Sequence, residues 1–274
     1  MDNTHNIYLI SDSTGETLER IFMALKAQFK YFKHNLFHFS FTRTENQLLK
    51  ILKEAEKKED SIILYTIVDN KLAKFLSQEA NKKNIPCFGV LGDLILNFSK
   101  LLNQKATHIP SGQHALNEEY YKRIEAIQFT MNHDDGNSRI DVHKSDIILL
   151  GVSRTSKTPT SIYLANRGYK TSNIPLINDS SIPERLKENP KVCCIVGLIV
   201  DPKRLYDVRK NRLTTIKENR KNNYTNLETI QEEIDKSKKA FKKYQWPIID
   251  VTRKSVEETA ASVIKMYEIF SNRK

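Results

Sequence analysis

Short apolar runs alternate with amphipathic stretches along residues 1–105, and this alternation restricts the folds open to the chain. Strands separated by helices can lie parallel in one sheet, with the helices covering both of its faces. The sequence therefore predicts an N-terminal α/β unit over residues 1–105. The expected strands are Ile7–Ile10, Leu36–Phe41, Ser61–Ile67 and Pro86–Leu91, and the expected helices are Leu18–Phe29, Asn46–Glu56 and Asn70–Lys83.

The rhythm is interrupted over residues 106–145, which hold a polar helical stretch, Asn117–Ala126, and a polar turn, His133–Gly136. We interpret this segment as a junction that carries an acidic loop. A second α/β unit is expected over residues 146–274, so the fold class is two α/β units with mainly parallel sheets. Its expected elements are the strands Asp146–Leu150, Val192–Val200 and Pro247–Val251, a helix through Ala165, a charged helical stretch Asn211–Tyr244, and a helix Ser255–Phe270.

A loop directly after the strand Asp146–Leu150 has the form G-x-x-x-x-S-K-T, one residue from the phosphate-loop pattern G-x-x-x-x-G-K-[ST]. Backbone N–H groups at such a strand–loop–helix junction point at an anion, and the helix dipole favours negative charge there. Lys157 would reach the terminal phosphate, and the Thr158 hydroxyl would bind Mg²⁺. The predicted nucleotide-binding residues are Gly151, Val152, Ser153, Arg154, Thr155, Ser156, Lys157 and Thr158.

Ser156 stands where the pattern has its second glycine. If this position needs a positive φ, a serine costs about 1 kcal/mol. An ordinary strand-to-helix turn is the alternative interpretation of the loop.

The turn after the first strand, Ser11–Thr17, is also rich in hydroxyl groups. Ligands of open α/β sheets sit at the carboxyl ends of strands, so this turn could be a second phosphate loop through Ser11, Ser13, Thr14 and Gly15. A well-capped strand-to-helix turn is an equally good interpretation, because helix caps favour the same residues.

Asp134 and Asp135 lie shortly before the strand that leads into the phosphate loop. Paired carboxylates at this place could accept a hydroxyl proton, hold Mg²⁺, or divide these roles. The alternative is a polar turn in which the carboxylates and the neighbouring His133 have no chemistry.

The net charge of +11 would suit a nucleic-acid-binding protein. Much of the excess lies in Lys203–Lys243, however, where acidic residues are interspersed, and no RNA-binding motif with interleaved aromatic residues is present. We expect a solvated lysine-rich surface rather than a nucleic-acid site. No apolar run approaches the ~20 residues that span a bilayer, and the N-terminus does not resemble a signal peptide. Cys87, Cys193 and Cys194 form no disulfide framework, so a cytoplasmic protein with buried thiols is expected.

These motifs together resemble one known family, the bacterial and plant regulatory proteins of pyruvate, phosphate dikinase, whose close relatives regulate phosphoenolpyruvate synthase. The resemblance runs almost from end to end. One departure is Thr225-Asn226 after Tyr224, where a small residue and an acid are expected. The segments that carry the resemblance are Ser11–Thr17, Phe129–Met131, His133–Gly136, Gly151–Ser161, Asn173–Leu176, Val196–Leu198, Asp201-Pro202, Trp246-Pro247, Asp250–Arg253 and Ser255–Ala261.

The resemblance implies a bifunctional enzyme with a protein substrate. Its kinase activity would use ADP to phosphorylate a threonine of the dikinase, which inactivates the target. Its second activity would remove that phosphoryl group with inorganic phosphate and release pyrophosphate. In this scheme Lys157 and Arg154 act on the transferring phosphate, and Asp134 or Asp135 is the threonine base or a metal ligand.

Two other function classes stay open at the level of sequence. One is a small-molecule kinase that uses ATP through the same loop, and the other is a basic nucleic-acid-binding or scaffolding protein. The sequence does not separate the dikinase from the synthase as target, although overall likeness favours the dikinase. The stretch Asn211–Tyr244, with its sparse apolar residues, could project from the body or form a homodimer contact.

Overall fold

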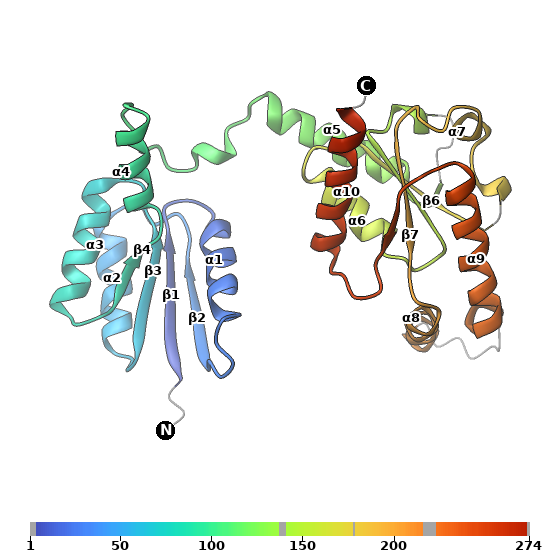
Figure 1. The fold of residues 1–274 in the computed structure, drawn as a ribbon. Coiled ribbons are helices and arrows are strands. Elements are labelled where there is room, and N and C mark those ends of the chain that lie inside the picture. The colour runs from blue at the N-terminus through green and yellow to red at the C-terminus, as the bar shows by residue number, and fades with distance from the viewer. Residues whose placement is uncertain (1–3, 137–140, 178, 216–222, 273–274) are drawn as a thin grey trace. The chain divides into compact units, whose positions relative to one another are not determined.

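The computed structural model describes residues 4–136, 141–177, 179–215 and 223–272 (Figure 1). The chain divides into two compact units, Met1–Ala115 and Leu116–Lys274. The expected junction 106–145 is therefore shared between them. Its polar helix, α5 (Glu118–Asn132), belongs to the second unit, because Ala126 and Thr130 are buried there.

The first unit is a four-stranded parallel sheet in the order β2-β1-β3-β4, which confirms the predicted fold class. The central strands β1 and β3 are in register, so that Ser11 pairs with Thr66 at their carboxyl ends. The elements are β1 (His5–Ser11), α1 (Glu16–Lys26), β2 (His34–Phe39), α2 (Glu45–Glu56), β3 (Ser61–Thr66), α3 (Asn70–Lys82) and β4 (Cys87–Gly89).

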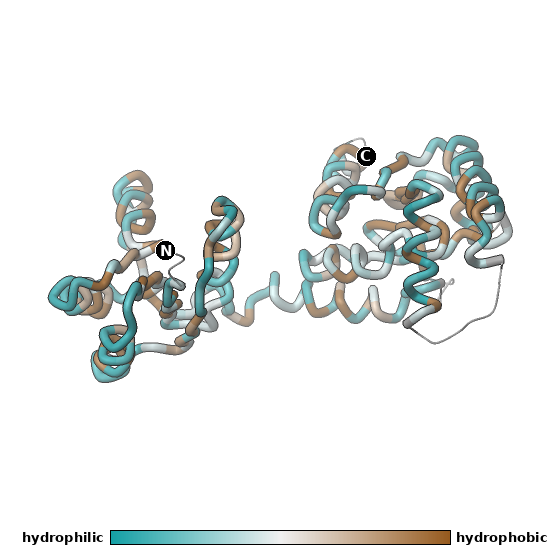
Figure 2. Tube along the Cα trace, turned by 90° about the horizontal axis from the view of Figure 1, so that it is seen from below, coloured by the Kyte–Doolittle hydropathy of each residue, from teal (hydrophilic) through white to brown (hydrophobic). Residues whose placement is uncertain are grey.

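Alternation along β1 divides the core of this unit into two layers. Tyr8 and Ile10 face the buried residues of α2 and α3, whereas Ile7 and Leu9 face α1. Helices therefore cover both faces of the sheet, as Figure 1 shows. In Figure 2 the helices alternate hydrophilic and hydrophobic residues along their length, which is the pattern of amphipathic helices on a sheet.

One helix of the first unit was not anticipated. It is α4 (Gly92–Leu101), and none of its residues is buried. Leu94 and Phe98 are 54% and 59% exposed, so the packing within this unit does not explain their apolar character.

The second unit is also a four-stranded parallel sheet, in the order β6-β5-β7-β8. Sequence analysis anticipated β5, β7 and β8 but not β6, the short helix α7 or the part of α8 before Asn211. The elements after α5 are β5 (Ile147–Gly151), α6 (Lys157–Ala165), β6 (Thr171–Pro175), α7 (Glu184–Glu188), β7 (Cys194–Ile199), α8 (Pro202–Thr215), α9 (Leu227–Lys243), β8 (Ile248–Asp250) and α10 (Val256–Ser271). The predicted capping box of α10, Ser255 with Glu258, is confirmed.

The charged stretch Asn211–Tyr244 was expected either to project from the body or to form a homodimer contact, but its described part packs on its own unit. Its described part includes the end of α8 and the whole of α9, whereas residues 216–222 lie outside the described residues. One face of α9 is buried in the core, including Ile230, Ile234 and Phe241. A Cβ at Gly197 on β7 would lie 2.5 Å from the Phe241 ring, so the glycine permits this close approach. The apolar residues are few but share one face, which is enough to dock the helix.

Cys193 and Cys194 are buried thiols, as predicted, and burial raises the pKa of Cys194 to about 11. The prediction is wrong for Cys87 at the end strand β4, which is only partly buried. Among the described residues the three cysteines form no disulfide. None of the described helices combines the length and apolar character that a membrane span requires.

Candidate functional site

The predicted phosphate loop joins the fully buried strand β5 to α6. Gly151 starts the loop where no side chain fits, because a Cβ there would lie 2.7 Å from the Leu198 carbonyl oxygen and from Thr155 Oγ1. Thr155 is buried and donates to the Val152 carbonyl across 2.9 Å, which closes the loop on itself. The loop is therefore held by local contacts before any ligand is considered.

Ser156 has φ 58° and ψ 21°, the left-handed conformation that glycine adopts freely. Arg154 is also left-handed, with φ 74°. Ser156 occupies the N-cap position of α6, but no side chain among the described residues caps the helix. The first N–H groups of α6 have no intrahelical partners, and together with the helix dipole they favour an anion at this end.

Lys157 lies in the first turn of α6 and is only 5% exposed. Its Nζ donates to the Val152 carbonyl across 2.9 Å, so the ammonium group lies against the loop backbone. Burial lowers the pKa of Lys157 to about 8, although the nearby carboxylates of Asp135 and Asp134 act in the opposite direction. An anionic ligand in the loop would raise the pKa of this lysine again, because a nearby negative charge favours the protonated form.

The next residue, Thr158, connects the loop to the acidic pair. Thr158 Oγ1 donates to Asp134 Oδ1 across 3.0 Å, and Asn173 Nδ2 donates to the same carboxylate oxygen. Asn173 Nδ2 also lies 2.9 Å from Thr158 Oγ1. Asn173 is fully buried and its Oδ1 has no hydrogen-bond partner in the described chain. A carboxylate, a hydroxyl and an amide thus meet at one place on β6 and α6.

Asp135 follows in the 3₁₀ turn η2 (Asp134–Gly136) with φ 49° and ψ 30°. It is exposed, and it lines a cavity of about 290 Å³ beside the phosphate loop. The two carboxylates of the pair are therefore in different environments. Asp134 accepts hydrogen bonds from Thr158 and Asn173, whereas Asp135 borders the cavity. The cavity is lined by Asp135, Ser153, Arg154, Ser156, Lys157, Thr158, Pro159, Pro175 and Val208.

A buried arginine on α8 contacts the backbone of the phosphate loop. Arg209 on α8 is 1% exposed, and its Nη2 donates to the Ser153 carbonyl across 3.3 Å and to Glu233 Oε2 across 2.6 Å. Its guanidinium also lies over the Tyr224 ring, 4.6 Å from the centroid. Tyr224 in turn accepts a hydrogen bond from Arg154 Nε at 3.2 Å. Thr225 and Asn226, where the sequence departs from the family pattern, directly follow Tyr224. Tyr224 nevertheless contacts the phosphate loop through Arg154.

Sequence analysis gave no role to Asn173, Arg209, Tyr224 or Glu233. Asn173 and Tyr224 were noted only as parts of the resemblance, and Arg209 was one cation among many in a charged stretch. The one available signal was the position of Asn173 near the carboxyl end of a strand, but β6 itself was not anticipated. Among the described residues no group of three or more His, Cys, Asp or Glu side chains could hold a metal ion.

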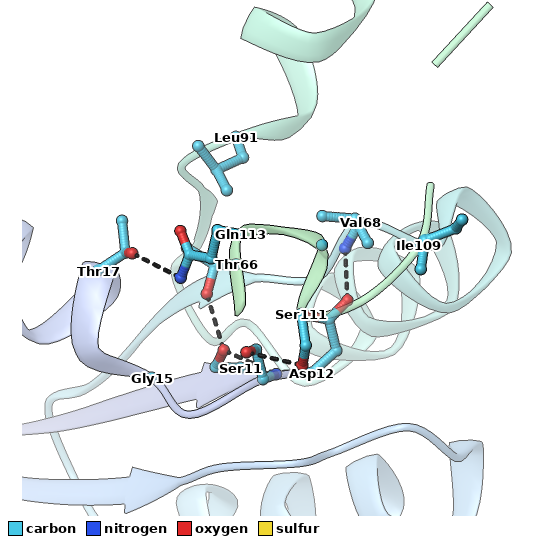
Figure 3. A pocket seen from close by; sticks show the side chains of 12 residues that line it. Ser11, Asp12, Gly15, Thr17, Thr66, Val68, Leu91, Ile109, Ser111 and Gln113 are labelled. Atoms are coloured by element: carbon cyan, nitrogen blue, oxygen red, sulfur yellow. Dashed lines mark hydrogen bonds between the residues drawn. The ribbon is translucent and has the colours of Figure 1, made fainter. Parts of the chain in front are cut away.

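The hydroxyl-rich loop of the first unit borders a separate cavity of about 180 Å³, shown in Figure 3. Ser11 lies at the end of β1, and Thr66 at the end of β3 donates to its hydroxyl across 3.1 Å. From the other side, Ser111 donates to Ser13 across 2.9 Å and Gln113 donates to Thr17 across 3.4 Å. Hydroxyls of this loop are therefore hydrogen-bonded to the end of β3 and to the segment that includes Ser111 and Gln113.

The N-cap of α1 is Gly15, with φ 88° and no side-chain cap. The interpretation of this turn as a capped helix start thus does not describe what its side chains do. Asp12 is 3% exposed and accepts from the Val68 N–H at 2.7 Å. Burial raises the pKa of the Asp12 carboxyl, against the opposing effects of the Val68 N–H and Arg43. A buried carboxylate beside the hydroxyls makes this loop less favourable for a phosphate than the loop of the second unit.

The comparison with protein families covers nearly the whole chain. The model of the family described as Kinase/pyrophosphorylase matches residues 7–264, which include both loops and the acidic pair. The chain belongs to this family. The family resemblance seen in the sequence is thereby confirmed.

Curated relatives match this chain over nearly their full length. A protein of Pelagibacter ubique is 68% identical over 99% of both chains, and it bears the name "Putative pyruvate, phosphate dikinase regulatory protein". Relatives with the same name from Geotalea uraniireducens and Sinorhizobium medicae are 42% and 44% identical, and each alignment covers 96% of this chain.

Proposed function

We propose that this kinase/pyrophosphorylase is a bifunctional regulator of pyruvate, phosphate dikinase. It would phosphorylate a threonine of the dikinase with ADP and remove that phosphoryl group with inorganic phosphate. The names of the relatives support the target, and the family description supports a kinase combined with a pyrophosphorylase. The observation that carries the proposal is the cavity beside the phosphate loop, which Lys157, Arg154 and Asp135 all line.

In the kinase direction the threonine oxygen attacks the β-phosphorus of ADP, and the bond to the α-phosphate oxygen breaks to release AMP. Asp135 takes the threonine proton, since it borders the cavity and no hydrogen bond to another described residue holds its carboxylate. The N–H groups at the start of α6, with Lys157 and Arg154, stabilise the charge that shifts onto the phosphate oxygens.

In the other direction an oxygen of inorganic phosphate attacks the phosphothreonine phosphorus. The bond to the threonine oxygen breaks, that oxygen takes up a proton, and pyrophosphate is released. Because both directions move one phosphoryl group past the same oxygens, one cationic cradle serves both.

The residues around Thr158 fit a magnesium ion. The Asp134 carboxylate and the Thr158 hydroxyl are oxygen ligands of the kind that Mg²⁺ takes, and the buried Oδ1 of Asn173 has no hydrogen-bond partner among the described residues. Protein sites for Mg²⁺ use one or two carboxylates together with phosphate oxygens, so three acidic ligands are not required. A bound ion would neutralise phosphate charge, while Asp134 and Asn173 keep Thr158 oriented.

The decisive experiment uses ADP labelled at its β-phosphate with purified pyruvate, phosphate dikinase and this protein. We expect label on a dikinase threonine together with release of AMP, and loss of the label as pyrophosphate when inorganic phosphate is added. Label transferred to phosphoenolpyruvate synthase but not to the dikinase would retain the chemistry and change the target. Absence of transfer from ADP to either protein would refute the proposal.

The second candidate is an ATP-dependent small-molecule kinase, which the phosphate loop alone would also support. A comparison of thermal stabilisation separates the two. A ligand at 100 times its Kd adds roughly 2.7 kcal/mol to the native state, so the shift is measurable. We expect ADP to stabilise the protein more than ATP at equal concentration, and the reverse order would favour the small-molecule kinase.

A further inference from the structure

The C-terminal unit has another cavity, about 1080 Å³ in volume and larger than the cavity beside the phosphate loop. It lies at the carboxyl ends of β7 and β8. Three carboxylates and three cations line it, so the net formal charge of these side chains is zero. They are Asp201, Arg204, Asp207, Asp250, Arg253 and Lys254. No part of the proposed phosphoryl transfer uses these residues.

The position of this cavity follows from the order of the strands. The chain passes from β5 to β6 on one side of β5, and then places β7 on the other side. The carboxyl ends of β5 and β7 therefore form a topological switch point, where open α/β sheets bind their ligands. The phosphate loop follows β5, and the second cavity begins with the residues that follow β7.

Helix α8 forms a wall that both cavities share. Arg204 and Asp207 line the larger cavity, whereas the next residue, Val208, lines the cavity of the phosphate loop. Arg209 then reaches the loop backbone at the Ser153 carbonyl. A ligand that begins at the loop can therefore extend along α8 into the larger space.

Volume and charge indicate which part of a ligand each cavity takes. Ligand cavities typically measure about 300–1,000 Å³, so the 290 Å³ beside the loop suits a phosphate chain and not a whole nucleotide. The balanced charge of the larger cavity offers little attraction for further phosphate. It suits a neutral group that carries hydroxyls and hydrogen-bonding edges.

Two of the three carboxylates are occupied in holding the cavity walls. Asp201 Oδ1 accepts from the Arg204 N–H at 3.0 Å, and Asp250 Oδ1 accepts from the Thr252 N–H at 2.9 Å. Thr252 Oγ1 also accepts from the Asp201 N–H at 2.9 Å, which ties the two loops together. Among the described residues no hydrogen bond involves the Asp207 carboxylate, which is exposed on α8.

We propose that this cavity binds the nucleoside part of the nucleotide whose phosphates lie in the loop. Asp207, on the second turn of α8, accepts hydrogen bonds from the ribose hydroxyls, which is the role that an acidic residue has in dinucleotide-binding sheets. Arg204 and Arg253 present planar guanidinium groups that stack on the base. The inference rests on the proposed nucleotide function and adds the residues that distinguish a nucleotide from a bare polyphosphate.

The test measures the binding of ADP and of inorganic pyrophosphate by calorimetry to the wild-type protein and to Arg204→Ala and Asp207→Asn. We expect both variants to lose at least tenfold in affinity for ADP and to keep their affinity for pyrophosphate within twofold. Asp207→Asn should also remove most of the difference between ADP and 2′-deoxy-ADP. Arg167→Ala, an exposed arginine that lines neither cavity, is the matched control and should match wild type with all ligands.

Unchanged ADP affinity in both variants overturns the inference, and so does an equal loss for ADP and pyrophosphate. Wild-type protein that binds ADP no more tightly than pyrophosphate also overturns it. The readout is binding and not transfer, so a failure to phosphorylate the dikinase would refute the proposed function and leave this result standing.

Discussion

The Thr158 hydroxyl donates a hydrogen bond to Asp134 Oδ1 across 3.0 Å, although the two residues lie 24 positions apart. This contact brings the acidic turn to the start of α6. It also separates the roles of the acidic pair, because Asp134 is engaged by Thr158 and Asn173 while Asp135 borders the cavity.

Asp135→Asn should reduce the kinase activity at least about 10²-fold and spare most of the phosphorolysis. A base is needed where a threonine hydroxyl loses its proton, and a lost general base typically costs about this factor. Attacking phosphate needs less help, since its second pKa is near ~6, as for a phosphate ester. The two activities are measured with the dikinase and its phosphorylated form.

Asp134→Asn should reduce both activities together, because the carboxylate that holds Thr158 acts in both directions. Asp141→Asn changes a half-buried carboxylate paired with Lys144 in the same segment and should leave both activities intact. If neither Asp134 nor Asp135 matters, the pair is only a polar turn. The buried Asp12 of the first unit is then the next carboxylate to substitute.

Lys157→Ala should abolish both activities and leave the melting temperature close to that of wild type or higher. The lysine would contact the transferring phosphoryl group in either direction, whereas its burial as a cation costs native stability. Kinase turnover above about a tenth of wild type in a normally folded variant would contradict this placement.

The affinity for pyrophosphate should fall about tenfold between pH 7 and pH 9, because the pKa of Lys157 is about 8 in the free protein. Only the protonated amine attracts the anion, and above its pKa each pH unit reduces the protonated fraction tenfold.

The stability of the ligand-free protein should show the opposite trend with pH. Its folded-state pKa is lowered from 10.5, so Lys157 contributes a gain in stability as the pH rises from about 8 to about 10.5. Lys157→Met should lack both effects, and a wild-type affinity independent of pH would show that the lysine is not at the phosphate.

Ser156→Gly should raise the free energy of unfolding by about 1 kcal/mol, because Ser156 has φ 58° and glycine adopts this conformation without strain. Ser153→Gly is the control in the same loop, since Ser153 is not among the residues with positive φ. Thermal or denaturant unfolding of the three proteins gives the comparison. Equal or lower stability of Ser156→Gly would show that the serine side chain contributes more than the strain it causes.

Glu233→Gln should destabilise the protein by about 3 kcal/mol, because it leaves the buried Arg209 without its counter-charge. The matched control is Glu232→Gln on the same helix. Glu232 and Lys236 are 68% and 66% exposed, and such a surface pair contributes at most about 1 kcal/mol. Similar losses of stability in both variants would show that the ion pair of Glu233 with Arg209 contributes little to the free energy of unfolding.

Features that depend on neighbours along the chain could be predicted from the sequence. Periodicity predicted two α/β units with parallel sheets, and the loop Gly151–Thr158 was placed correctly between a buried strand and a helix. The capping box at Ser255 and the positive φ expected of a glycine position at Ser156 also follow from local geometry. Each of these depends on residues only a few positions apart.

Tertiary structure alone decided what surrounds the loop. Arg154 meets Tyr224 across 70 positions, Arg209 meets Ser153 across 56, and Asp134 meets Asn173 across 39. Such long-range pairs cannot be predicted from the periodicity of the sequence. The strand order that joins them is set by the packing of helices on both faces of the sheet. A charged stretch that looked solvated thus supplied a buried arginine, since a single buried face on α9 and one ion pair were enough to hold it in the core.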